Sequence, residues 1–98
     1  MARFDVYGLR AGGLVLDCQA NLLSGLSTRF VVPLLPEAEA PKPAERLNPV
    51  FIVSGARYIM ATQFAATVAL AELVDEVGSL KREEFAISNA LDMLLTGY

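Results

Sequence analysis

FDVYGLRAGGLVLDCQANLL, residues 4–23, contains two alternating runs on either side of a glycine-containing turn. In the first run Phe4 and Val6 alternate with more polar neighbours, which is typical of a half-buried strand. The second run alternates in the same way, because successive side chains of an extended chain point to opposite faces. Its apolar face comprises Leu14, Leu16, Cys18, Ala20 and Leu22, and its polar face comprises Asp17, Gln19 and Asn21. The stretch therefore predicts two strands joined by the RAGG turn at residues 10–13.

More strands are predicted downstream of this hairpin. The segment TRFVVPLL at 28–35 is rich in β-branched and aromatic residues and predicts a third strand, with Pro33 near its end as in an edge strand or a bulge. The segment NPVFIVSGARYIMA at 48–61 predicts two more strands, joined by a tight turn at Ser54 and Gly55.

Two segments interrupt the predicted strands. Residues 36–46 contain three of the five prolines and no large apolar side chain, so we expect an exposed loop there. Residues 62–77 mix good helix formers with β-branched residues, which leaves helix and strand both open. We interpret them as a loop or short helical turn at 63–66 followed by a strand at 67–73.

The C-terminal segment predicts a helix over residues 81–96. Its large apolar side chains recur at intervals of two to four residues, with charged and polar side chains between them. They are Phe85, Ile87, Leu91, Leu94 and Leu95. We assign Phe85 and Leu91 to the core of the protomer, and we expect Gly97 to end the helix. The predicted fold class is mostly β with a C-terminal α-helix.

Length and composition indicate a single domain, residues 1–98, with one hydrophobic core. Hydrophobic residues make up 54% of the chain, which is high for so small a monomer, so we expect part of the apolar surface to face another subunit. The sequence has neither a sustained apolar run long enough to span a membrane nor an apolar signal peptide, which predicts a cytoplasmic protein without membrane contact. The net charge of −3 argues against direct nucleic-acid binding.

The residues that usually carry catalysis are scarce. The chain has no histidine, and its single cysteine, Cys18, falls on the apolar face of a predicted strand, where we expect a buried and inert thiol. The carboxylate pairs at 75–76 and 83–84 are adjacent in sequence, and adjacent side chains do not face each other across a substrate. We therefore predict no catalytic set, no metal site and no cofactor, and so no enzyme.

Five motifs in their order resemble the CcdB family, the toxin half of toxin–antitoxin pairs. They are RFDVY at 3–7, DCQANLL at 17–23, RFVVPL at 29–34, NPVFIV at 48–53 and LKREEFAISNALDMLLTGY at 80–98. The resemblance implies an SH3-like antiparallel barrel or sheet with a long C-terminal helix. It also implies a homodimer that binds the A subunit of DNA gyrase, traps the gyrase–DNA cleavage complex and is neutralised by a CcdA-like antitoxin, as in plasmid maintenance.

The same resemblance assigns residues to these surfaces. The gyrase-binding positions are Leu22, Leu23, Asp92, Thr96, Gly97 and Tyr98. The antitoxin-binding segments are residues 8–13 and 36–46, with Gly8, Leu9, Arg10, Glu39, Lys42 and Arg46 as the named positions. The dimer interface includes Met93 and Leu94.

One departure from the family pattern affects the predicted target. A tryptophan that inserts into gyrase is expected at position 96, where this chain has threonine. Either Tyr98 takes over the stacking contact, or the protein has the toxin fold with weak or no gyrase activity. A third alternative is a ribonuclease toxin of the related MazF or Kid type, using Arg29 or Arg57 together with Asp17. A non-toxic dimeric adaptor is a fourth.

Overall fold

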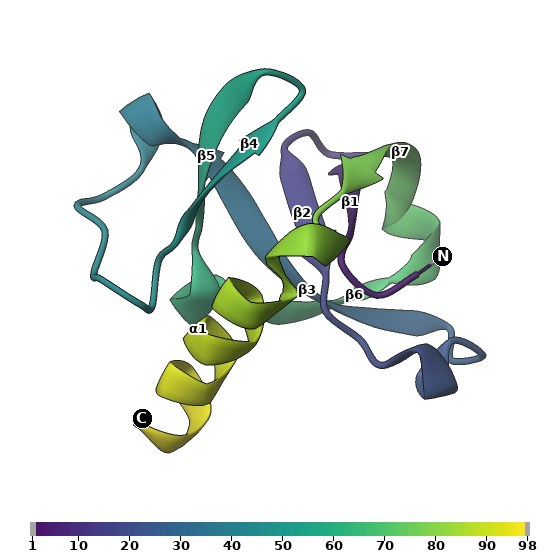
Figure 1. Ribbon diagram of the computed structural model, residues 1–98. Helices are drawn as coiled ribbons and strands as arrows, with labels where there is room; N and C mark the ends of the chain where they lie inside the picture. Colours follow the sequence, from purple (N-terminus) through teal and green to yellow (C-terminus); the bar gives the residue numbers. More distant parts are fainter. Residues whose placement is uncertain (1, 98) are drawn as a thin grey trace.

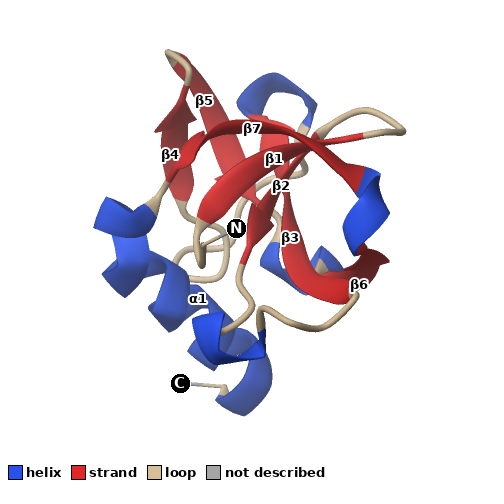
Figure 2. Cartoon of the chain, turned by 90° about the vertical axis from the view of Figure 1, so that its right-hand side faces the viewer, coloured by secondary structure: helices blue, strands red, loops and turns tan. Residues whose placement is uncertain are grey.

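A strongly curled antiparallel sheet forms most of the molecule, and one α-helix packs against it (Figures 1 and 2). The computed structural model describes residues 2–97. The strands are β1 (Asp5–Leu9), β2 (Leu14–Asp17), β3 (Thr28–Pro36), β4 (Val50–Val53), β5 (Ala56–Met60), β6 (Ala66–Ala69) and β7 (Leu73–Ser79), and the helix is α1 (Glu84–Thr96). The strand order is β4-β5-β3-β2-β1-β7, and β6 also pairs with β3. The predicted class, mostly β with a C-terminal helix, is confirmed.

The first hairpin forms as expected, but its second strand is shorter than predicted. Val6 pairs with Leu16 and Tyr7 with Val15, while β2 ends at Asp17. The chain then turns into a short 3-10 helix at Asn21–Leu23. The predicted faces are only partly right here: Cys18 is buried as predicted, but Asp17 is fully buried and Leu22 is 94% exposed.

Strand β3 is central, so Pro33 does not lie on an edge strand, which was one of the two placements expected for it. On one side β3 pairs with β2. On the other side its first half, Thr28–Val31, pairs with β6, and its end, Leu34–Pro36, pairs with β5. Pro33 lies between these two halves, where a missing N–H interrupts no pairing with either partner. Its carbonyl accepts a hydrogen bond from the N–H of Ala61.

The turn between β4 and β5 is the predicted tight turn, with positive φ at both Ser54 and Gly55. The segment 62–77 is only partly as predicted. A 3-10 turn occupies Thr62–Phe64, and a second 3-10 turn at Leu70–Glu72 separates two strands, β6 and β7, where one was expected. Strand β7 borders the sheet beside β1, so most of its side chains are exposed and its sequence lacks a clear apolar face.

Helix α1 follows a 3-10 turn at Lys81–Glu83 and places Ile87 and Ala90 in the main core. Leu91 packs against that core as predicted, but Phe85 is 81% exposed, so its assignment to the core is wrong. Phe85 lies two residues before Ile87, which places it about 200° around the helix, on the opposite face. Gly97 takes a left-handed conformation at the helix end and donates its N–H to the carbonyl of Met93.

Residues 36–46, which we call the 36–46 connection, run from the last residue of β3 towards β4; they are mostly exposed and include a 3-10 turn at Glu37–Glu39. Its far end is fixed by Asn48, which is buried. The Asn48 side chain accepts a hydrogen bond from the N–H of Ala44 and donates to the carbonyl of Met60 and to Oε1 of Gln63. Within residues 2–97, no helix is long and apolar enough to cross a bilayer.

Candidate functional site

The segment that follows β2 exposes three leucines to solvent. Leu22 is 94% exposed, and Leu23 and Leu26 are about half exposed. We call residues 21–26 the leucine tip. Its 3-10 turn buries no residue of its own, so the tip is not held to the body by a hydrophobic anchor. A projecting apolar loop of this kind is typical of a surface that binds another protein.

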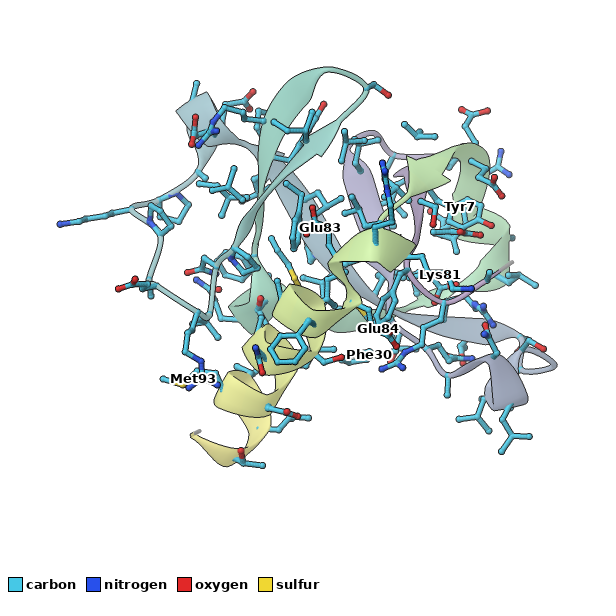
Figure 3. The ribbon with its side chains drawn as sticks, in the orientation of Figure 1. Tyr7, Phe30, Lys81, Glu83, Glu84 and Met93 are labelled. Atoms are coloured by element: carbon cyan, nitrogen blue, oxygen red, sulfur yellow. The ribbon has the colours of Figure 1, made fainter. Side chains whose placement is uncertain are left out.

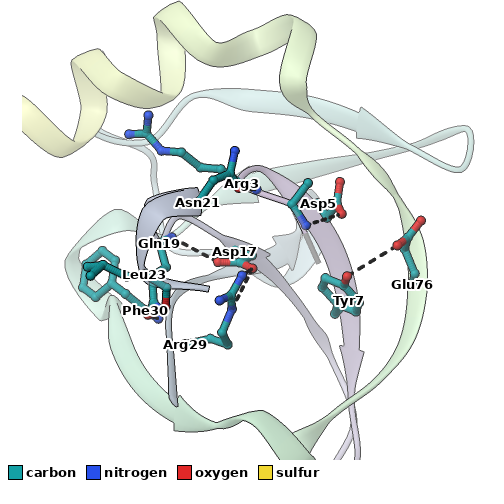
Figure 4. Close-up of polar contacts among 11 residues, drawn as sticks. Arg3, Asp5, Tyr7, Asp17, Gln19, Asn21, Leu23, Arg29, Phe30 and Glu76 are labelled. Carbon is teal, nitrogen blue, oxygen red and sulfur yellow. Dashed lines mark hydrogen bonds and ion pairs between the residues drawn. The ribbon is translucent and has the colours of Figure 1, made fainter. Parts of the chain in front are cut away.

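Polar contacts hold the leucine tip in place (Figure 4). The Gln19 side chain accepts a hydrogen bond from the N–H of Phe30 and donates one to the carbonyl of Leu23, both at 2.9 Å. The Asn21 side-chain oxygen accepts a hydrogen bond from the N–H of Arg3 at 2.8 Å. The tip is therefore tied both to β3 and to the N-terminal segment.

A buried ion pair lies beneath these contacts. Arg29 donates from Nη2 and Nε to Oδ2 of Asp17, at 2.7 and 3.1 Å, and both side chains are fully buried. The other carboxylate oxygen of Asp17 accepts the N–H of Gln19 at 3.0 Å. The pair considered for a ribonuclease is thus formed, but it lies inside the protein. Arg57, the other arginine considered, instead pairs with Glu37 at the surface, which lowers the pKa of Glu37 through their hydrogen bond.

The end of α1 is the second exposed apolar surface. Leu95 is 74% exposed, and Met93 and Leu94 are each more than a third exposed; Met93 projects from the free end of the helix (Figure 3). Asp92, Thr96 and Gly97 are exposed as well. The Thr96 hydroxyl donates to the carbonyl of Asp92 at 2.7 Å. Tyr98 lies outside the described residues.

The predicted gyrase-binding residues do not come together within one protomer. The leucine tip, with Leu22 and Leu23, lies at the right of Figure 1, and the free end of α1 lies at the left. A partner that touches both surfaces must therefore span the molecule, or must meet the tip of one protomer and the helix end of another.

A largely apolar groove of about 600 Å³ lies on another part of the surface. Its lining residues come from the first hairpin, from β3 and β5, and from the start of the 36–46 connection. Of the predicted antitoxin-binding residues, Leu9 and Glu39 line it. Gly8, Arg10, Lys42 and Arg46 are not among the residues that line it. The groove brings together the two segments that the resemblance assigned to the antitoxin.

Two titratable side chains near the buried pair have raised pKa values. Burial, followed by the charge of Asp17, raises the pKa of Cys18 to about 12. Burial, followed by the charges of Asp5 and Glu76, raises the pKa of Tyr7 to about 12, and the Tyr7 hydroxyl lies 3.4 Å from the Glu76 carboxylate. Cys18 is buried as predicted.

Within residues 2–97, no three side chains of metal-binding type cluster together.

Cys18 is expected to resist alkylation in the folded protein. Only the thiolate reacts, and because burial raises the pKa of Cys18 to about 12, the folded protein holds far less thiolate at pH 8 than an exposed thiol would. Iodoacetamide labelling followed by mass spectrometry should show slow reaction at pH 8 and fast reaction in 8 M urea. Labelling of the folded protein at the rate of the unfolded chain would contradict the burial of this thiol.

A protein-family model described as "CcdB protein" matches residues 3–97. No curated protein matches the sequence. A similar solved structure is titled "Endoribonuclease from Mycobacterial species", with a TM-score of 0.79 and 18% sequence identity over 97% of this chain and 90% of that one. At this identity the likeness concerns the fold alone.

Proposed function

The chain belongs to the CcdB family, and on this premise we propose that it is a toxin that binds the A subunit of DNA gyrase and traps the gyrase–DNA cleavage complex. CcdB proteins are toxins of toxin–antitoxin systems, so membership implies an antitoxin as one kind of partner. The observation that supports the gyrase proposal is the leucine tip, because Leu22 and Leu23, which the resemblance assigns to gyrase binding, are exposed to solvent.

The exposed surfaces favour a protein target over a substrate. An interface core gains most of its energy from apolar side chains that lose their water on binding, and such side chains cluster at the leucine tip and at the end of α1. The two surfaces lie apart in one protomer. In the proposed homodimer, Met93 and Leu94 join the two protomers at the ends of α1, and each protomer offers its own leucine tip as a separate contact for gyrase.

The groove suits the antitoxin. It is lined mainly by apolar side chains, and it joins the first hairpin to the start of the 36–46 connection. An extended apolar segment of an antitoxin fills such a groove without displacing a packed side chain. Because the groove and the leucine tip use different residues, the antitoxin and the target make separate first contacts on this protein.

A ribonuclease is the second candidate, since the similar solved structure is named an endoribonuclease. RNA cleavage needs cationic groups that reach the phosphate. Arg29 is fully buried and already paired with Asp17, and the net charge of −3 disfavours RNA binding. These observations support the gyrase proposal over the ribonuclease.

The purified protein should convert supercoiled plasmid to linear DNA in the presence of bacterial gyrase and ATP, after detergent and protease treatment. Thr96→Trp should lower the concentration required by about 30-fold to 1000-fold, because a buried tryptophan is worth about 2 to 4 kcal/mol at an interface centre. Thr96 is exposed, and the hydrogen bond described for its hydroxyl lies within the last turn of α1, so the variant should fold normally.

The same two proteins incubated with RNA provide the control. Fragmented RNA together with intact plasmid would favour the ribonuclease. No linear DNA from either protein would reject gyrase as the target.

A further inference from the structure

Where the chain leaves the sheet, the side-chain oxygen of Gln19 takes the place of a backbone carbonyl as hydrogen-bond acceptor. Regular pairing of β2 with β3 extends to Asp17 and Val31, and the N–H of Cys18 then donates to the carbonyl of Phe30. One residue later the side-chain amide of Gln19 accepts the N–H of Phe30 and donates to the carbonyl of Leu23. An amide side chain thus links a strand of the sheet directly to the leucine tip (Figure 4).

The backbone of Gln19 is held in place by the buried Asp17–Arg29 pair. The Gln19 backbone N–H donates to the Asp17 carboxylate at 3.0 Å, and that carboxylate is fixed by Arg29. Gln19 itself is 8% exposed, so its side chain is largely shielded from bulk water. Hydrogen bonds in such an environment are strong, and a buried donor or acceptor that loses its partner is costly.

We propose that Gln19 is a positioning residue, which sets the orientation of the leucine tip for target binding and does not itself touch the target. The inference rests on the proposed function, in which Leu22 and Leu23 contact the target. The tip buries no residue of its own, so its direction depends on polar contacts. The only other side-chain contact described for the tip turn is from Asn21, which faces the N-terminal segment rather than the sheet.

Gln19→Leu removes both hydrogen bonds with little change in side-chain volume, and Asn48→Leu is the matched control. Asn48 is equally buried and also forms side-chain hydrogen bonds to backbone groups, but it secures the 36–46 connection. Both variants should lose thermal stability. Only Gln19→Leu should weaken binding to the purified A subunit of bacterial gyrase, by about tenfold or more, measured by calorimetry at a temperature where both are folded.

Hydrogen exchange provides a readout that does not depend on the target. Gln19→Leu should speed amide exchange at Phe30 and across residues 20–26, and Asn48→Leu should leave those amides unchanged while speeding exchange at Ala44. Equal loss of gyrase binding in the two variants, or unchanged exchange across the tip in Gln19→Leu, would overturn the positioning role.

The two proposals fail in different ways. Absence of gyrase binding by the unaltered protein rejects the proposed function, and it rejects the role in target binding with it. Normal gyrase binding by the unaltered protein together with normal binding by Gln19→Leu rejects the positioning role alone.

Discussion

Arg29→Met is expected to lower the free energy of unfolding by about 3 to 5 kcal/mol, the usual cost of removing one partner of a buried ion pair. The Asp17 carboxylate would stay fully buried and would keep only its hydrogen bond from the Gln19 N–H. For a chain of 98 residues this is a large part of the total stability. Urea denaturation followed by circular dichroism measures the loss.

Two controls distinguish the loss of stability caused by an unpaired buried charge from the loss caused by removing any arginine. The double variant Asp17→Asn with Arg29→Met should recover much of the stability, because asparagine still accepts the Gln19 N–H and carries no charge. Arg57→Met, at the surface pair with Glu37, should change stability far less. If Arg29→Met were as stable as Arg57→Met, the Asp17–Arg29 pair would have little importance for the fold.

Leu22→Asp is expected to abolish growth arrest while leaving the fold intact. Leu22 is 94% exposed, and substitutions at such positions usually change stability by no more than about 0.5 kcal/mol. At an interface centre, however, a buried carboxylate without a partner is strongly unfavourable. Loss of about 2 to 4 kcal/mol of binding corresponds to about 30-fold to 1000-fold weaker affinity for the gyrase A subunit.

Ile52→Asp is the matched control for this experiment. Ile52 is also an exposed aliphatic side chain, at 56%, but it lies on β4 and outside the leucine tip. The Ile52→Asp variant should still arrest growth and should bind gyrase normally. Growth arrest by Leu22→Asp at normal expression would remove the leucine tip from the target surface.

The sequence predicts those elements whose signals are local. Alternation marks the first hairpin, the Ser54–Gly55 pair marks the second, and apolar spacing marks the helix. The prediction fails where a residue far along the chain determines whether a side chain is buried. Asp17 reads as an outward polar residue because nothing in its own strand reveals Arg29, which follows 12 positions later. Phe85 reads as core because interval counting did not resolve which face of the helix it occupies.

The candidate surfaces were predictable only in part. The resemblance placed Leu22 and Leu23 on a binding surface, and both are exposed. It also pointed to the two segments that meet at the groove. Gln19 and Asn48 were missed, because a lone amide gives no periodic signal and its role depends on backbone groups far along the chain. For Gln19 the one available hint is a polar residue between the end of a strand and a pair of leucines.

The pairing of β1 with β7 has a consequence for how the protein is made. Asp5 pairs with Ser79 and Leu9 with Leu73, so β1 leaves the ribosome long before the strand with which it pairs. Closing so long a loop is slow compared with forming the local hairpins. Until residue 79 emerges, the outer edge of β1 has no partner strand, and an open edge invites pairing with other chains. Folding of a newly made copy is therefore completed only after residue 79 has emerged, and until then a chaperone that covers the open edge of β1 has most to contribute.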